Sequence, residues 1–141
     1  MNQVITESYD GAVIPFQAGD AFVNATAMCA AFGKEPYEFL RLTSTQSFVD
    51  ALTEELGENP VVTRRGNFGV NRENPVSLVQ GTWLHPDLAL ECARWLSPKF
   101  SIWCNRVIRR ILSGEVMFGK SADSFPDFQD NSKLVVTKEV A

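Results

Sequence analysis

The amino-acid sequence predicts a small α+β domain, and three observations favour this fold class. β-like stretches flank a tight-turn dipeptide near the N-terminus, stretches with helical spacing follow, and a glycine- and asparagine-rich ribbon separates two groups of helices. The 141 residues amount to about one ordinary domain. Because 45% of them are hydrophobic, the chain has enough apolar material for a core, which excludes disordered and low-complexity proteins.

The N-terminal part is expected to be a β-hairpin followed by a third strand. The Asp-Gly dipeptide at 10–11 is a favoured two-residue turn between apolar stretches. Pro15 indicates that the second strand ends there or lies at an edge. A Gly-Asp turn at 19–20 then leads into a short strand over residues 21–23.

Two helices separated by about three residues are predicted next, in the arrangement of a helix-turn-helix. Asn24 suits the N-cap of a helix over residues 25–32, and Gly33 ends this helix in a left-handed conformation. Pro36 suits the first position of a short helix over residues 36–42. Tight helical pairs also occur in proteins that never contact DNA, so this pattern alone does not establish a function.

A third helix is predicted over residues 45–56, with Thr43, Ser44 or Thr45 as its cap. Its inner residues are expected to be Phe48, Val49, Leu52 and Leu56. Its acidic outer residues are Asp50, Glu54 and Glu55. Because carboxylates repel phosphates, we do not place this outer face on a nucleic acid.

Residues 61–84 predict a long β-ribbon. Strand-like stretches at 61–63 and 76–79 flank a glycine- and asparagine-rich segment over 66–75, which is too long for a tight turn. We interpret that segment as a flexible, exposed tip.

Two helices that begin at Pro86 and Pro98 are predicted to close the fold. The second ends at Gly114 and carries three arginines opposite its apolar stripe, where the helix dipole favours cations near the C-terminus. These are Arg106, Arg109 and Arg110. The apolar stripe is expected to contain Phe100, Trp103, Val107, Ile108, Ile111 and Leu112. The domain is predicted to span residues 1–118, followed by a flexible polar tail or linker over 119–141.

The sequence contains few residues with the spacing that enzymatic or metal chemistry requires. His85 is the sole histidine and precedes a proline at a strand-to-helix junction, where a capping or structural role is expected. No nucleophile motif and no Gly-Lys-Ser/Thr phosphate loop is found. The cysteines at 29, 92 and 104 are expected to be buried, reduced thiols. We therefore predict no enzyme activity, no cofactor and no metal.

The chain is acidic overall, with its basic residues gathered at a few places. The formal net charge is −4, yet the ribbon over 60–82 has a local charge of +2, from Arg64, Arg65 and Arg72 against Glu73. Guanidinium groups bind phosphates bidentately or enter a narrow minor groove, and asparagine amides donate to base edges. A solvated hairpin without a ligand is the alternative interpretation. Neither a signal peptide nor a membrane-spanning stretch is recognisable, which predicts a cytoplasmic protein.

Three motifs, in the right order, resemble those of the KilA-N domain. The family's (F/Y)(V/I)NAT opening is similar to residues 22–29, Phe-Val-Asn-Ala-Thr-Ala-Met-Cys. Its GTW-hydrophobic-HP-x-LA signature is similar to residues 81–89, Gly-Thr-Trp-Leu-His-Pro-Asp-Leu-Ala. Its following xWxSPxF element is similar to residues 94–100, Arg-Trp-Leu-Ser-Pro-Lys-Phe. The resemblance covers about residues 4–115.

KilA-N domains occur in large DNA viruses and bacteriophages, often at the N-terminus of antirepressors, and are similar to the fungal APSES domain with its helix-turn-helix and wing. The resemblance implies a KilA-N/APSES-like fold with an N-terminal hairpin, a helix-turn-helix, a β-ribbon wing and two closing helices. It also implies that the motif residues are architectural. Asn24 and Thr26 would cap the first helix, while Gly81, Thr82 and a buried Trp83 would fix the end of the wing.

By analogy with winged helix-turn-helix proteins, DNA contacts are expected from the variable segments 34–46 and 64–74. The candidate contact residues are Lys34, Arg41, Thr43, Ser44, Thr45, Gln46, Arg64, Arg65, Asn67, Asn71 and Arg72. The two acids of the second helix, Glu35 and Glu38, shift the prediction toward the wing, and Glu38 is spaced to pair with Arg41.

The leading prediction is a phage or prophage regulatory protein of the antirepressor type that binds duplex DNA in the cytoplasm of the bacterial host. The alternative is a protein-interaction module that inactivates a repressor, with its acidic surface against a basic partner. DNA binding should weaken with salt along a line set by the number of phosphate contacts, whereas the alternative predicts no binding to DNA even at low salt.

Overall fold

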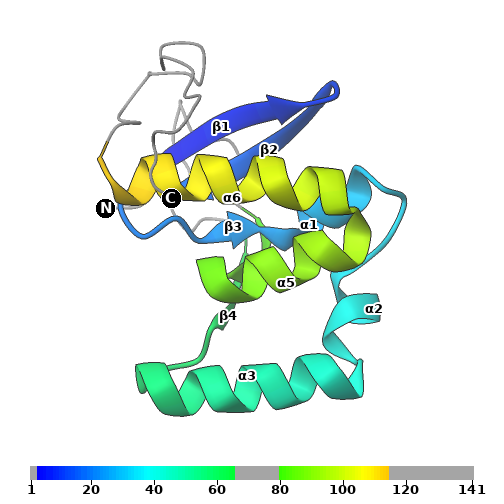
Figure 1. Ribbon diagram of the computed structural model, residues 1–141, viewed down its shortest axis with the longest axis vertical. Helices are drawn as coiled ribbons and strands as arrows, with labels where there is room; N and C mark the ends of the chain where they lie inside the picture. The colour runs from blue at the N-terminus through cyan, green and yellow to red at the C-terminus, as the bar shows by residue number, and fades with distance from the viewer. Residues whose placement is uncertain (1–2, 66–79, 115–141) are drawn as a thin grey trace.

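The structure is a computed structural model that describes residues 3–65 and 80–114, and it confirms the predicted α+β class (Figure 1). The strands in this part of the chain are β1 (Val4–Tyr9), β2 (Ala12–Gln17), β3 (Val23–Asn24), β4 (Val61–Arg64) and β5 (Gly81–Leu84). Its helices are α1 (Ala25–Ala30), α2 (Pro36–Leu40), α3 (Thr43–Leu56), α5 (Pro86–Leu96) and α6 (Pro98–Leu112). None of the helices described is long and apolar enough to cross a membrane.

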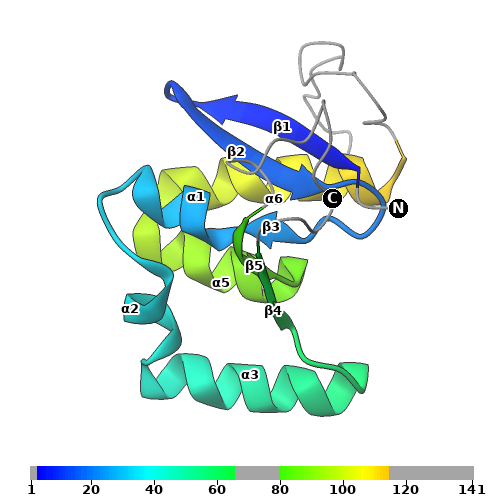
Figure 2. The same cartoon turned by 180° about the vertical axis from the view of Figure 1, so that it is seen from behind.

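The strands form one antiparallel sheet in the order β1-β2-β3-β5-β4. The short strand β3 joins the N-terminal hairpin to the β4–β5 pair, because Val23 pairs with Phe16 of β2 and Asn24 pairs with Trp83 of β5. Figure 2 shows the hairpin and the β4–β5 pair on the same side of α5 and α6. The motif around Asn24 therefore lies where the two halves of the sheet meet.

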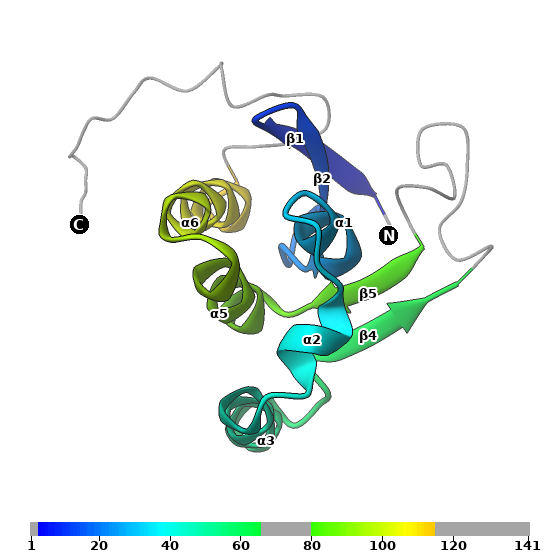
Figure 3. The ribbon, with the colours of Figure 1, turned by 90° about the vertical axis from the view of Figure 1, so that its right-hand side faces the viewer.

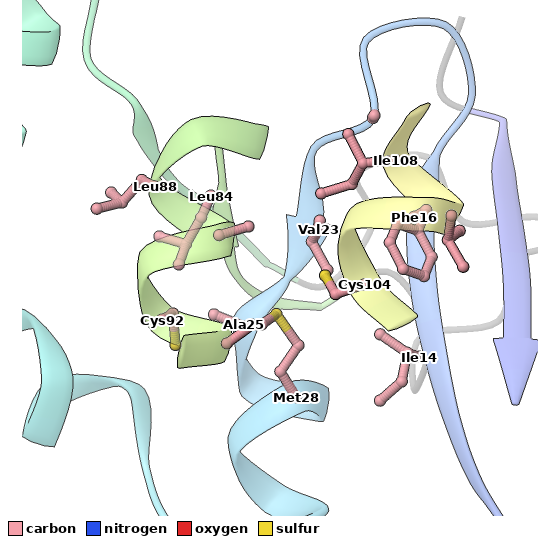
Figure 4. Close-up of a cluster of buried hydrophobic side chains, with 14 of the residues drawn as sticks. Ile14, Phe16, Val23, Ala25, Met28, Leu84, Leu88, Cys92, Cys104 and Ile108 are labelled. Atoms are coloured by element: carbon pink, nitrogen blue, oxygen red, sulfur yellow. The ribbon is translucent and has the colours of Figure 1, made fainter. Parts of the chain in front are cut away.

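The hydrophobic core lies between the sheet and helices α1, α5 and α6. Ile14, Phe16 and Val23 project from the sheet toward Met28 of α1 and Ile108 of α6, and all five are 3% exposed or less (Figure 4). The aromatic rings of Tyr9, Phe32, Phe100 and Trp103 extend this core at the hairpin.

The cysteine prediction is confirmed, because the three side chains are fully buried. Cys29 of α1 and Cys92 of α5 bring their Sγ atoms to 3.9 Å, in hydrogen-bonding contact. This contact and burial raise the pKa of Cys92, and burial raises the pKa of Cys104 to about 12. The thiols of Cys92 and Cys104 are therefore protonated parts of the core, whereas the contact with Cys92 lowers the pKa of Cys29.

Two strand predictions are wrong at their ends. Strand β2 continues through Pro15 to Gln17 and has a neighbour on each side. Proline is tolerated there because β3 pairs with β2 only at Phe16. Strand β3 begins at Val23 because Ala21 adopts a left-handed φ of 62°, and its N–H donates to the Gln17 carbonyl at 3.0 Å.

The predicted first residues of α1 and α2 are confirmed, and the predicted first residue of α3 is wrong. Gly33 is left-handed as predicted, with a φ of 71°, although α1 already ends at Ala30. Helix α3 begins at Thr43 because the Gln46 N–H donates to the carbonyl of Leu42, which is the N-cap. Thr43, Ser44 and Thr45 therefore form the first turn of α3 and do not cap it.

The predicted tip over 66–75 and the predicted strand over 76–79 lie outside the described residues, as do the candidate contacts Asn67, Asn71 and Arg72 and the predicted tail. Strand β4 pairs with β5 at residues 81–84. The base of the predicted ribbon is thus described, and its distal part stays a prediction.

Candidate nucleic-acid interface

Two sequence motifs that lie far apart in the chain meet at the base of the β4–β5 pair. The Asn24 Oδ1 accepts from the Ala27 N–H at 3.1 Å, which confirms the predicted cap of α1, and its Nδ2 donates to the Gln80 carbonyl at 3.3 Å. Thr26 does not complete that cap. Its Oγ1 accepts from the Thr82 N–H at 3.1 Å and so holds the start of β5 against α1.

Gly81 lies against these two side chains, where there is no space for a Cβ atom. Its φ is 133°, a conformation that favours glycine, and a Cβ built on it would lie 2.8 Å from the Thr26 Oγ1 and 3.1 Å from the Asn24 Oδ1. The Asn-Ala-Thr and Gly-Thr-Trp motifs are therefore one structural unit that fixes β5 to the first helix.

Arg64, a candidate DNA contact, is a buried residue of the wing base. Its Cζ lies 4.3 Å from the centroid of the fully buried Trp83 ring, and its Nη2 donates to the Gln17 Oε1 of β2. Burial lowers the pKa of Arg64, whereas the carboxylate of Asp20 opposes that shift. With 7% of its surface exposed, Arg64 is an anchor between β4, β5 and β2, and its contact with DNA stays a prediction.

The neighbouring Arg65 is exposed at the end of β4. A hollow of about 350 Å³ beside it is lined by Thr63, Arg64, Arg65, Gln80, Gly81 and Thr82. Figure 3 shows β4 and β5 projecting away from the helices, with α2 beside the base of the pair. Arg65 is therefore the accessible cation of the wing within the described residues.

The remaining candidate contacts lie at the two junctions that flank α2. Lys34, Arg41, Thr43, Ser44 and Gln46 are exposed, and the Lys34 Nζ lies 5.3 Å from the Trp95 ring centroid. Thr45 is only 4% exposed, unlike the other candidates of this group, and its contact with DNA stays a prediction. The structure thus brings together two groups, one around α2 and one at the end of β4.

The acids of α2 have a structural function that the sequence analysis did not find. The Glu38 Oε2 accepts from the Glu35 N–H at 3.0 Å and thereby forms part of a capping box at the start of α2. Sequence reasoning also missed Tyr37, which is 64% exposed and lies four residues before Arg41, on the same helix face. Tyr37 is therefore a further exposed side chain beside Arg41.

His85 has the predicted capping role, because its Nδ1 accepts from the Asp87 N–H at 3.1 Å at the start of α5. The outer acids of α3 are exposed as predicted. Among residues 3–65 and 80–114, no three His, Cys, Asp or Glu side chains are grouped to hold a metal ion.

An antiparallel sheet with a projecting strand pair, next to a short helix flanked by exposed cations and hydroxyls, defines a small α+β domain of the winged type. The KilA-N domain family matches residues 7–114, so the chain belongs to the KilA-N family, whose members are non-catalytic DNA-binding domains of phages and viruses.

Protein kilA of Escherichia phage P1 is 30% identical to this chain over 92 residues. The matched region is 64% of this chain and 30% of the phage protein, so the chain spans less than a third of that relative. No solved structure is significantly similar to the chain.

Proposed function

We propose that this domain binds duplex DNA with the α2 region and the wing together. The α2 region supplies Lys34, Tyr37, Arg41, Thr43, Ser44 and Gln46. The wing supplies Arg65, together with Asn67, Asn71 and Arg72 from the ribbon sequence. The observation that carries the proposal is the exposed Arg65 at the end of a strand pair that Arg64, Trp83 and Gly81 hold rigidly against the body of the domain.

The two groups have different tasks in this proposal. The cations neutralise phosphates, which gives affinity without sequence preference, while the tyrosine, hydroxyl and amide side chains of the α2 region lie where base edges or sugars are reached. The capping role of Glu38 gives this acid a structural function at the start of α2, while the exposed cations Lys34 and Arg41 flank the helix.

We further propose that the domain is the DNA-binding part of a longer phage or prophage regulator of the antirepressor type. The relative from phage P1 supports this, because the domain is 30% of that protein and the remaining length is available for other functions. In such a protein the domain selects the DNA site, and other segments act on the regulated partner.

Fluorescence anisotropy with a labelled duplex tests the proposal across a series of salt concentrations. Log affinity should fall linearly with log salt, by about 0.9 per neutralised phosphate. A matched single strand and a random duplex serve as controls for duplex and sequence preference. If the domain has no affinity for any duplex at low salt but captures a repressor protein, the interaction-module alternative replaces the proposal.

A further inference from the structure

Helix α6 is basic in a chain whose net charge is negative. It contains Lys99, Arg106, Arg109 and Arg110 and no acidic residue, so the other residues of the chain together carry −8 against a total of −4. The helix dipole favours the two arginines of the last turn. It disfavours Lys99, which lies in the first turn, so the dipole does not account for the basic character of the whole helix.

An aliphatic side chain lies in the middle of these cations. Ile102 is 57% exposed and lies three residues after Lys99 and four before Arg106, so the three share one face of α6. Leu112, which the sequence placed on the inner stripe, is 54% exposed at the end of the helix. Ile102, between two cations, offers an apolar contact that a protein surface uses and a phosphate does not.

Helix α3 has the opposite composition. Asp50, Glu54 and Glu55 are exposed, and no lysine or arginine occurs between Thr43 and Leu56. Leu56, also predicted to face inward, is 36% exposed beside the two glutamates. The molecule therefore has an acidic α3 face (Asp50, Glu54 and Glu55) that complements the basic α6 face (Lys99, Ile102, Arg106 and Arg109).

These two faces do not meet within one molecule. Figures 1 and 3 show α5 between α6 and α3, with α3 at the far end of the row. Both faces are exposed, whereas Phe100, Cys104 and Val107 of α6 and Leu52 of α3 are buried on the opposite sides of their helices. We propose that the basic α6 face of one copy of this chain binds the acidic α3 face of a second copy.

This contact is heterologous, because it joins different surfaces of identical molecules. Each added copy presents a free α6 face at one end and a free α3 face at the other, so the assembly closes into a ring or grows by successive addition, depending on the rotation between copies. Neither face includes a residue proposed to contact DNA, but Thr43 and Gln46 lie on the same side of α3 as Asp50 and Glu54, so association and duplex affinity are measured separately. Because both faces are solvent-exposed, the association should weaken as salt rises above about 0.1 M.

Charge reversal tests the proposal by sedimentation velocity on the full chain. An α6 variant (Arg106→Glu with Arg109→Glu) has two acidic faces, and an α3 variant (Asp50→Lys with Glu54→Lys) has two basic faces. Each variant alone should associate at least about tenfold more weakly than the parent, because like charges then oppose each other. An equimolar mixture of the two variants should recover the association, because each then meets a face of opposite charge.

The control matched to the α6 variant is Lys34→Glu with Arg65→Glu, which makes the same change of −4 in net charge outside both faces and should leave association unchanged. Circular dichroism melting of each variant confirms that the fold is retained. A parent that stays monomeric at low salt overturns the proposal, as does a mixture that fails to associate. If the parent is monomeric and the α6 variant loses affinity for the duplex, the proposal is overturned, and the α6 face is instead a second nucleic-acid surface.

Discussion

Arg64 and Arg65 are adjacent in the sequence, and the structure gives them opposite roles that mutation can separate. Arg64→Ala removes a cation–π contact with Trp83, for which about 0.5–2 kcal/mol is typical, and a charged hydrogen bond to Gln17, for which about 1.5–3 kcal/mol is typical. Because the two overlap in one side chain, we expect the free energy of unfolding to fall by about 2–4 kcal/mol. For a domain of this size, Tm should fall by about 10 °C or more.

Arg65→Ala is the matched control, because this side chain is exposed. Its effect on the free energy of unfolding should stay within about 0.5 kcal/mol. The duplex affinity should instead fall, and the slope of log affinity against log salt should flatten by about 0.9 if Arg65 contacts one phosphate.

Thermal melts by circular dichroism and anisotropy titrations on the same two variants give both quantities. Arg64→Lys keeps the charge but loses the planar group that stacks on the ring, so its Tm should lie between those of the parent and Arg64→Ala. The reasoning fails if Arg64→Ala melts like the parent and flattens the salt slope, because Arg64 would then be a phosphate contact.

Three further results are expected. In chemical denaturation, Gly81→Ala should lose about 1–3 kcal/mol more stability than Gly33→Ala. Both glycines have a positive φ, but only at Gly81 do other side chains occupy the space of a Cβ. Equal losses of stability would contradict the contact between the two motifs. Trp83→Ala should lose about 3–5 kcal/mol of stability because its ring is fully buried, and an unchanged melting curve would show that the ring is dispensable. The three cysteines should react with a thiol reagent near pH 8 only after denaturation, since burial keeps the pKa of Cys104 near 12, and rapid native labelling would refute their burial.

The sequence was sufficient where local chemistry determines structure. Asn24 and Ser97 are N-caps, and Pro36 and Pro98 are first residues of helices. Each acts over one helical turn, and each marks a helix start as predicted. The start of α3 was wrong because three consecutive hydroxyl residues all suit a cap, and the N-cap is instead Leu42. Thr45 lies seven residues before the buried Leu52, a helical spacing that already indicated its burial.

The burial of Arg64 could not be predicted from the sequence, because it depends on contacts between strands that no local pattern reveals. Val62 pairs with Trp83, so Arg64, two residues along the same face of β4, lies diagonally opposite the indole ring. Its hydrogen-bond partner Gln17 lies at the end of β2. Both relations depend on the strand order and on the register of β4 against β5. A charged residue beside a turn is exposed by default, and only this tertiary arrangement reverses that expectation.

The same arrangement explains why the family motifs and the proposed DNA contacts occupy different residues. Asn24, Thr26, Gly81 and Trp83 are held by short contacts with one another or with Arg64, so changes at these positions disturb the base of the wing. Arg65 and the exposed residues around α2 extend from that base without being part of it. The proposed contact residues therefore take no part in the contacts that fix the base of the wing. We therefore expect substitutions at the proposed contact residues to change duplex affinity with little effect on stability, and substitutions at the base to do the reverse.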